Sequence, residues 1–244
     1  MSQMSAHAFY TGLVADLYTP LKSTRFRPGP YRELIRRFGE PALELGCGDG
    51  DPLLDLREGG LDVDGIDSSP DMIRRLRGRA AERGLEVDAW IVSMQTMRLV
   101  RSYRTIFLAG PTFNLLPDDQ TMAKALSKIE QTLTSDGTAV IPLFVPEPVG
   151  VDEIGVPARQ DTPTGWIAWQ MVDAARSEAA QTQTLTLRYE RVEGSEKETL
   201  DRDWVIHWIS VDVFTEMARR AGLRVVASPQ RVGPEPADII LQHS

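Results

Sequence analysis

Short apolar runs alternate with amphipathic segments between residues 42 and 145. In the amphipathic segments the apolar residues recur every three or four positions, which is the period of a helix. The expected elements are strands over residues 42–45, 61–66, 85–92, 105–109 and 138–145, and helices that begin at Asp51-Pro52, Ser69-Pro70 and Asp118. Strands and helices that alternate at this length predict a parallel sheet covered by helices on both faces.

Two further helices are expected before the first strand. One covers residues 8–18 and ends at Pro20, and the other covers residues 30–38.

Asp51 is expected to cap the first helix of the alternating region, with Pro52 at its first position. The turn expected at Asp136-Gly137 precedes the fifth strand.

The alternation stops after Val145, where prolines crowd a loop. Residues 166–173, 184–192 and 198–209 then show period-two patterns, and a turn at residues 193–195 joins the last two. This pattern predicts an antiparallel insert of two or three strands. A helix over residues 211–221 and strands over residues 223–227 and 238–242 complete the α/β part.

The most informative segment is the glycine-rich loop of residues 44–51, which leads from a strand into a helix. Glycines there let the backbone turn sharply and approach a ligand. A dinucleotide fingerprint requires Gly or Ala where this chain has Asp51, and the carboxylates of Glu44, Asp49 and Asp51 would repel a pyrophosphate. S-adenosylmethionine (SAM) carries a sulfonium and an ammonium group, so the acidic loop favours SAM over NAD.

Asp67 ends the second expected strand, about twenty residues beyond the loop, a distance known from dinucleotide-binding folds. A carboxylate in this position can accept hydrogen bonds from both ribose hydroxyls of an adenosine ligand. The feature serves NAD and SAM alike. The alternative is a turn aspartate, because Ser68, Ser69 and Pro70 follow.

Composition and charge restrict the class of partner. The chain has 244 residues, a formal net charge of −8 and a single cysteine, Cys47. The negative charge opposes nucleic-acid binding, and the arginines of residues 74–79 are expected on a solvated helix face. One cysteine excludes an internal disulfide and a multi-cysteine zinc site. We expect a cytoplasmic protein with no metal, no membrane span and no secretory signal.

Residues 44–50 match the E/D-x-G-x-G-x-G motif of class I SAM-dependent methyltransferases, and residues 65–72 resemble the second motif of that family. The resemblance implies a Rossmann-like fold, with a seven-stranded, mostly parallel sheet in the order 3-2-1-4-5-7-6. It also implies the SAM-binding residues, which are Glu44, Gly46, Cys47, Gly48, Gly50, Asp67, Ser68, Met72, Ser93, Met94 and Ala109. One departure is that Val92-Ser93-Met94 stands where the family often has Gly-Asp-Met, so a carboxylate near the adenine is missing.

The segment Phe9–Tyr18 resembles the N-terminal lid of actinobacterial sugar N-methyltransferases and glycine-N-methyltransferase-like enzymes. That resemblance implies that Tyr10 and Tyr18 close over the methionine part of SAM and that Tyr10 reaches the substrate. The alternative is core packing by amphipathic aromatic rings. The implied domains are a helical lid (1–40), a SAM-binding domain (41–145 and 210–244) and an insert over the substrate pocket (146–209).

Candidates for a catalytic base are few, because His7 and His243 lie near the termini. His207, in the last strand of the insert, and Tyr10 are the catalytic candidates. The expected substrate-binding residues are Phe113, Asn114, Trp166 and Arg188. For each of these the alternative is an ordinary structural role: a loop, a sheet core or an exposed surface position.

Together these features predict a SAM-dependent methyltransferase that moves a methyl group to an O or N atom of a small metabolite, by in-line displacement in a closed pocket. S-adenosylhomocysteine (SAH) would be the product, and the resemblance implies a role in secondary metabolism for a monomer or homodimer. Three alternatives remain open. They are a SAM-using enzyme that cyclises SAM or transfers an aminocarboxypropyl group, a NAD-binding oxidoreductase, and an inactive SAM-binding protein.

Overall fold

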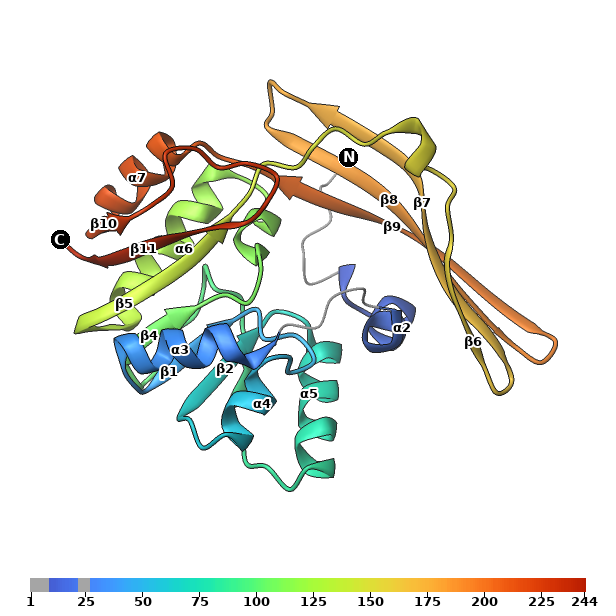
Figure 1. The fold of residues 1–244 in the computed structure, drawn as a ribbon, viewed down its shortest axis with the longest axis horizontal. Coiled ribbons are helices and arrows are strands. Elements are labelled where there is room, and N and C mark those ends of the chain that lie inside the picture. Colours follow the sequence, from blue (N-terminus) through green and yellow to red (C-terminus); the bar gives the residue numbers. More distant parts are fainter. Residues whose placement is uncertain (1–8, 22–26) are drawn as a thin grey trace.

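The computed structural model describes residues 9–21 and 27–244, which form two separate sheets with helices around the larger one (Figure 1). The larger sheet comprises β1 (Ala42–Leu45), β2 (Val63–Asp67), β3 (Ala89–Ile91), β4 (Tyr103–Phe107), β5 (Leu133–Leu143), β10 (Leu223–Ala227) and β11 (Ala237–His243). Its order is β3-β2-β1-β4-β5-β11-β10. Since β10 and β11 are its sixth and seventh strands, this is the predicted order 3-2-1-4-5-7-6.

The first five strands of this sheet are parallel, and β11 is antiparallel to both β5 and β10. Alternate residues of a buried strand point to opposite sides, so both faces of the sheet carry apolar side chains and each face is covered by its own helices. Leu43 and Leu45 pack with α6 (Asp119–Thr132) and α7 (Val211–Arg220). Ala42 packs on the other face with α3 (Pro28–Phe38), α4 (Leu53–Glu58) and α5 (Pro70–Glu82). This is the Rossmann-like α/β architecture that the sequence predicts.

The insert forms a four-stranded antiparallel sheet in the order β6-β7-β8-β9. Its strands are β6 (Ala158–Thr162), β7 (Gly165–Ser177), β8 (Thr182–Glu193) and β9 (Glu196–His207). The sequence predicts only two or three of them. It misses β6 because the residues of this edge strand are almost all exposed and show no apolar alternation.

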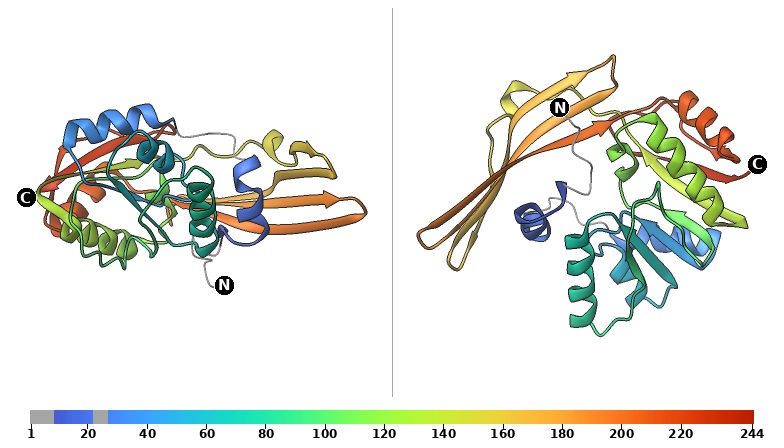
Figure 2. Two further views of the ribbon diagram at one scale, coloured as in Figure 1. Left: turned by 90° about the horizontal axis from the view of Figure 1, so that it is seen from below. Right: turned by 180° about the vertical axis from the view of Figure 1, so that it is seen from behind.

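Helix α2 (Leu13–Leu21) lies between the two sheets in Figure 1 and in both views of Figure 2. Leu13 and Leu17 pack on Ile167 of β7, and Val14 packs on Leu187 of β8. The inner face of the insert is therefore covered by the N-terminal segment. None of the helices in residues 9–21 and 27–244 has the length and apolar character needed to cross a membrane.

Several predicted element boundaries are wrong for local reasons. The helix predicted over residues 8–18 is not continuous: residue 8 lies outside the described residues, and α2 begins only at Leu13, because Gly12 adopts a φ of 55° and donates its N–H to Asp71. Pro20 lies inside its last turn instead of ending it. Asp51 does not cap α4, since Pro52 occupies the cap position.

Two strands also differ in length from the prediction. The third strand covers only Ala89–Ile91. The fifth begins at Leu133, and the predicted turn at Asp136-Gly137 is a bulge within it. The pairing of β5 with β4 passes from Leu133 directly to Thr138, so the intervening residues bulge out while the strand continues.

Gly65 in β2 tests how closely the sheet and the glycine-rich loop are packed. A Cβ on Gly65 would lie 2.5 Å from Leu53 Cδ1 and 2.8 Å from Cys47 Sγ. We expect Gly65→Ala to lower the free energy of unfolding by about 1–3 kcal/mol through overpacking. Gly78→Ala is the matched control, because nothing lies within 4 Å of its Cβ position on α5. Helix propensity should make the control up to ~1 kcal/mol more stable in urea unfolding. Equal effects of the two substitutions would contradict this packing.

Candidate active site

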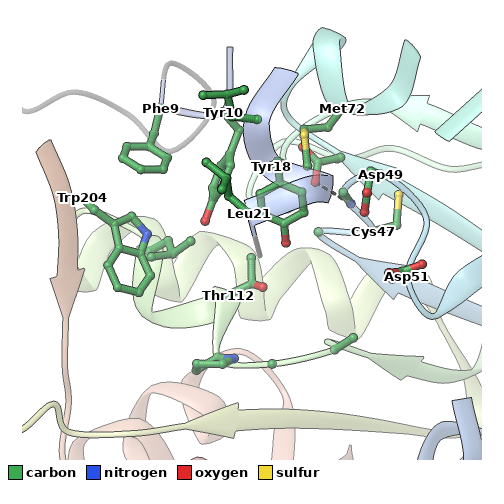
Figure 3. Close-up of a pocket in the computed structure, with 18 of the residues that line it drawn as sticks. Phe9, Tyr10, Tyr18, Leu21, Cys47, Asp49, Asp51, Met72, Thr112 and Trp204 are labelled. Carbon is green, nitrogen blue, oxygen red and sulfur yellow. Dashed lines mark hydrogen bonds between the residues drawn. The ribbon is translucent and has the colours of Figure 1, made fainter. Parts of the chain in front are cut away.

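A cavity of about 380 Å³ lies at the carboxyl ends of the central strands, between the core sheet and the insert (Figure 3). The core contributes one wall through its glycine-rich loop, and the insert contributes an apolar wall. Residues 9–21, here called the α2 segment, form the roof. The lining includes Gly46, Cys47, Gly48, Asp49, Asp51, Asp67 and Met72 from the core, Phe9, Tyr10, Leu17 and Tyr18 from the roof, and Trp169, Leu187, Tyr189 and Trp204 from the insert. Ala109 and Thr112 line it beyond β4.

The glycine-rich loop needs its glycines for backbone conformation and for space. Gly46 and Gly48 have φ angles of 74° and 53°, which disfavour any residue with a side chain. A Cβ on Gly46 would also lie 2.7 Å from Thr112 Cγ2. The N–H groups of Gly46 and Cys47 donate to the Ile66 carbonyl at 2.8 and 3.0 Å. The loop is thereby fixed to the end of β2.

Asp67 connects this loop to the start of α5. Its Oδ2 accepts the Gly48 N–H at 2.9 Å, and its Oδ1 accepts the Ser69 N–H at 2.8 Å. Burial raises the pKa of the Asp67 carboxyl, and these two hydrogen bonds oppose that rise. Each carboxylate oxygen keeps a lone pair for a ligand hydroxyl. Asp67 is therefore both a structural anchor and a group that can bind a ribose.

The two loop aspartates share one arginine, which the sequence reasoning missed. Arg79 of α5 contacts Asp49 Oδ2 at 2.8 Å and Asp51 Oδ1 at 2.7 Å. The prediction that the arginines of residues 74–79 form a solvated face is wrong for Arg79, which is partly buried. Its place three residues after buried Leu76 and just before buried Ala80 is the signal that could have found it.

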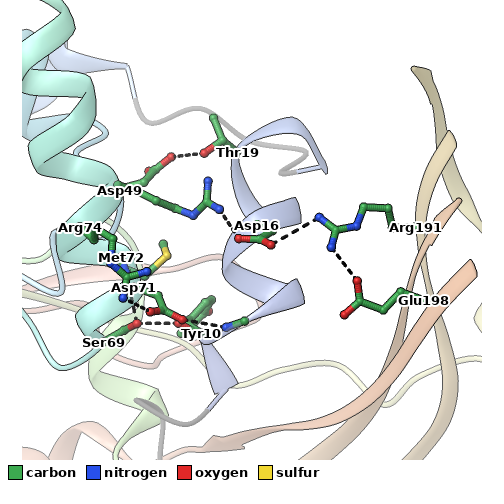
Figure 4. A network of polar contacts seen from close by, with 12 residues as sticks. Tyr10, Asp16, Thr19, Asp49, Ser69, Asp71, Met72, Arg74, Arg191 and Glu198 are labelled. Carbon is green, nitrogen blue, oxygen red and sulfur yellow. Dashed lines mark hydrogen bonds and ion pairs between the residues drawn. The ribbon is translucent and has the colours of Figure 1, made fainter. Parts of the chain in front are cut away.

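The α2 segment is held to the core and to the insert by polar contacts (Figure 4). The Thr19 hydroxyl donates to Asp49 Oδ2 at 2.6 Å, and the Ser69 hydroxyl donates to the Tyr10 carbonyl at 2.5 Å. Asp16 pairs with Arg75 of α5 and also, at 3.4 Å, with Arg191 of β8. Arg191 continues to Glu198 of β9 at 2.6 Å. One helix therefore connects both sheets around the cavity.

Tyr10 and Tyr18 both lie in the cavity, with ring centroids 5.6 Å apart in an edge-to-face contact. Burial and the charge of Asp67 raise the pKa of Tyr10 to about 12. Burial likewise raises the pKa of Tyr18 and of Tyr189. All three phenols are protonated at neutral pH, so they act as hydrogen-bond donors and not as bases.

The predicted catalytic histidine lies outside the cavity. The end of β9 packs against the short 3-10 helix η1 (Thr112–Leu115), which buries His207 against the core. The His207 Nε2 lies 3.4 Å from Asp119 Oδ1. His243, at the end of β11, contacts Glu130 of α6, and His7 lies outside the described residues.

The predicted substrate residues also point elsewhere. Phe113 is buried edge-to-face against Phe214, and Asn114 donates to the carbonyls of Phe144 and His207 at 3.1 and 2.9 Å. Trp166 lies under the guanidinium of Arg159, and Arg188 forms a bidentate pair with Asp201 on the outer face of the insert. Alternation along the strands puts Trp169 and Tyr189 on the inner face instead.

Some predicted cofactor residues support the cavity without lining it. A Cβ on Gly50 would lie 2.7 Å from Leu54, so this glycine allows close packing. Ser93 pairs with Thr96, and Met94 is buried in the core. Glu44 and Ser68 are also absent from the described lining residues. Among the parts of the chain that the structure describes, no cluster of three or more His, Cys, Asp or Glu side chains is arranged to hold a metal.

Residues 42–137 match a family model described as "Methyltransferase domain". This segment is therefore similar to a methyltransferase domain. The match covers β1 to the start of β5, and thus the glycine-rich loop, Asp67 and the strands that carry them. No protein of curated function matches the sequence.

Solved structures share the fold of both the larger sheet with its helices and the insert. The sugar N-methyltransferase KedS8 from Streptoalloteichus sp ATCC 53650 is 17% identical, with a TM-score of 0.77 over 100% of this chain and 98% of its own. A SAM-dependent methyltransferase from Clostridium acetobutylicum is 12% identical, with a TM-score of 0.72 over 94% and 97%. CalS10, a SAM-bound amino pentose methyltransferase from Micromonospora echinaspora, is 16% identical, with a TM-score of 0.68 over 95% and 97%. At these identities the likeness establishes a shared fold.

Glu44 is a buried carboxyl in β1, and neither of its oxygens has a hydrogen-bond partner among the described residues. Burial and the charges of Asp51, Asp67 and Asp49 raise its pKa well above the ordinary value. The folded protein therefore keeps a proton that the unfolded chain loses near the ordinary glutamate pKa. Stability contributed by this proton is lost as the pH rises toward the folded-state pKa.

We expect Glu44→Gln to be more stable than the wild type at pH 8, with a smaller difference at pH 5. About 1 kcal/mol would raise the melting temperature by roughly 2–4 °C in a chain of this size. Thermal unfolding without ligand at both pH values measures the effect. Glu82→Gln on the exposed surface of α5 is the control and should show no such pH-dependent gain. A wild type that is the more stable protein at pH 8 would refute the argument.

Proposed function

We propose that this chain is a SAM-dependent methyltransferase that methylates a nitrogen atom of a small molecule. The observation that carries the proposal is one cavity with two unlike walls. The core wall is acidic and glycine-rich, with Asp49, Asp51 and Asp67, whereas the insert wall is aromatic. The first suits a cationic adenosine ligand, and the second suits an organic substrate.

The core wall fits SAM in charge and in shape. Gly46 and Gly48, which adopt positive φ angles, carry no Cβ atom, so a ligand can approach the loop backbone at these two positions. Asp67 is placed to accept ribose hydroxyls, and Met72 beside Gly48 offers an apolar surface to the adenine. The loop carboxylates complement the sulfonium and ammonium groups. The solved structures with this fold include one with SAM bound.

When bound, SAM supplies an activated methyl group, so that the new bond to the nucleophile forms as the carbon–sulfur bond breaks and SAH leaves. The protein must align the two reactants and exclude water. Phe9, Leu17 and the ring of Tyr18 close the roof over the loop. The contacts of Asp16 and Thr19 hold that roof against both sheets.

The tyrosines of the cavity favour nitrogen over oxygen as the methyl acceptor. A hydroxyl must lose its proton as it attacks, whereas an amine can attack through a free lone pair and lose its proton afterwards. Tyr10, Tyr18 and Tyr189 remain protonated at neutral pH because burial raises the pKa of each. These groups can orient an amine but cannot deprotonate an alcohol.

The same proposal includes a small-molecule substrate and no nucleic-acid or membrane partner. It also includes a cytoplasmic location and a monomeric or homodimeric state. The net charge of −8 supports the first two, because nucleic-acid phosphates attract a basic surface. The sugar N-methyltransferase among the structures with this fold supports a small polar amine, and the amino pentose methyltransferase, which is involved in calicheamicin biosynthesis, supports a role in secondary metabolism.

Cofactor binding is tested by thermal unfolding with SAM, SAH or NAD in excess. A ligand at about a hundred times its dissociation constant adds roughly 2.7 kcal/mol, or about 5–10 °C for this chain. We expect that shift with SAM and SAH and none with NAD. Asp67→Asn should weaken SAH binding at least tenfold, by about 1.4 kcal/mol, while Asp203→Asn on the exposed insert surface should not. A shift with NAD alone would refute the cofactor assignment.

The reaction is tested with methyl-labelled SAM and a panel of amino sugars and their hydroxyl counterparts. We expect SAH to form and the label to appear on nitrogen in the amines only. Transfer to the hydroxyl compounds would move the assignment to oxygen. Products that retain the methyl on sulfur would show that another carbon of SAM is attacked.

A further inference from the structure

A hydrogen-bond donor without an acceptor lies in the insert wall of the cavity. Trp204 of β9 lines the cavity, and its indole Nε1 is buried with no hydrogen-bond partner among the described residues. Tryptophan N–H groups in protein interiors usually have an acceptor, because an unpaired buried donor is destabilising. An orphan donor at a cavity surface is therefore evidence for a ligand acceptor.

The Tyr10 hydroxyl lies near the Trp204 N–H. The indole N–H lies close enough to this phenol to oppose, as a hydrogen-bond donor, the rise in the pKa of Tyr10, but the two groups do not reach the full geometry of a hydrogen bond. Figure 3 shows the indole nitrogen on the side of the ring that faces Tyr10. Tyr10 is itself held by edge-to-face contacts with Phe9 at 4.8 Å and with Tyr18 at 5.6 Å. Packing therefore fixes both polar groups without joining them.

The chemistry of this pair defines what it can bind. An indole N–H only donates, and a protonated phenol both donates and accepts. Neither carries charge, and the side chains that surround them, Trp169, Leu187 and Tyr189, are apolar or neutral. Such a subsite fits a neutral oxygen, which can accept from the indole and exchange a second hydrogen bond with the phenol.

We propose that Trp204 and Tyr10 form a subsite for a hydroxyl or carbonyl oxygen of the substrate, and that the Trp204 N–H selects substrates which carry this oxygen. The inference rests on the proposed function, since the subsite lies in the same cavity as the glycine-rich loop. It adds a specificity-determining residue on the insert and a substrate class, an amine that also bears a neutral oxygen.

The test uses protein saturated with SAH and four probes of one ring size: cyclohexylamine and the 2-, 3- and 4-aminocyclohexanols. Calorimetry measures affinity, and the indole N–H signals of ¹⁵N-labelled protein report contact. We expect at least one aminocyclohexanol to bind about tenfold more tightly than cyclohexylamine. It should also shift the indole signal that is missing from W204F.

Trp204→Phe keeps an aromatic ring and removes the N–H, so it should reduce the preference to within about twofold. Trp169→Phe is the matched control, because it shortens a second tryptophan of the same wall and should keep the preference. A preference that survives in W204F, or four probes that bind alike or not at all, would overturn the subsite. If W204F does not fold, the indole signal of Trp204 is assigned in the wild type by sequential NMR experiments, and its failure to shift with the preferred probe would overturn the subsite.

SAH binding distinguishes a failure of the Trp204–Tyr10 subsite from a failure of the proposed function. If SAH stabilises the wild type and W204F equally but no preference is found, the subsite is wrong and the cofactor site stands. If SAH does not bind the wild type, the proposed function fails, and the subsite argument fails with it.

Discussion

The carboxylate of Asp67 joins three segments that the cavity requires. One oxygen holds the Gly48 N–H of the glycine-rich loop, and the other holds the Ser69 N–H at the start of α5. The Ser69 hydroxyl oxygen then accepts the Met72 N–H and so caps α5, and the same hydroxyl donates a hydrogen bond to the Tyr10 carbonyl. A single side chain at the end of β2 therefore sets the loop, the following helix and, through Ser69, the roof of the cavity.

The roof depends on a balance between apolar packing and charge. Leu13 and Leu17 are buried against the insert, while Asp16 on the same helix bridges Arg75 of the core and Arg191 of the insert. Exposed ion pairs contribute little each, so the apolar contacts provide most of the stability and the charges orient the helix. This arrangement lets one nine-residue helix close a cavity between two sheets.

Alternation along the strands of the insert separates the residues that reach the cavity from those that do not. Trp166 and Trp169 differ by an odd number of positions and lie on opposite faces, as do Arg188 and Tyr189. The period-two pattern contains this information. It does not say which face is covered, since both faces carry tryptophan or tyrosine, and only the position of α2 decides that the face of Trp169 and Tyr189 is the inner one.

The resemblance to a known family implied the strand order, whereas the sequence by itself determined the parallel sheet and the loop at the ends of β1 and β2. Local patterns and two motifs control these features, because strand period, glycine conformation and the Ser69 cap all act within a few residues. The tertiary structure alone decided which side chains meet across the cavity. Arg79 reaches Asp49 across thirty residues, and Trp204 approaches Tyr10 from the other end of the chain. His207, a base candidate by type, is buried against η1, because contacts between distant segments depend on packing that no local pattern records.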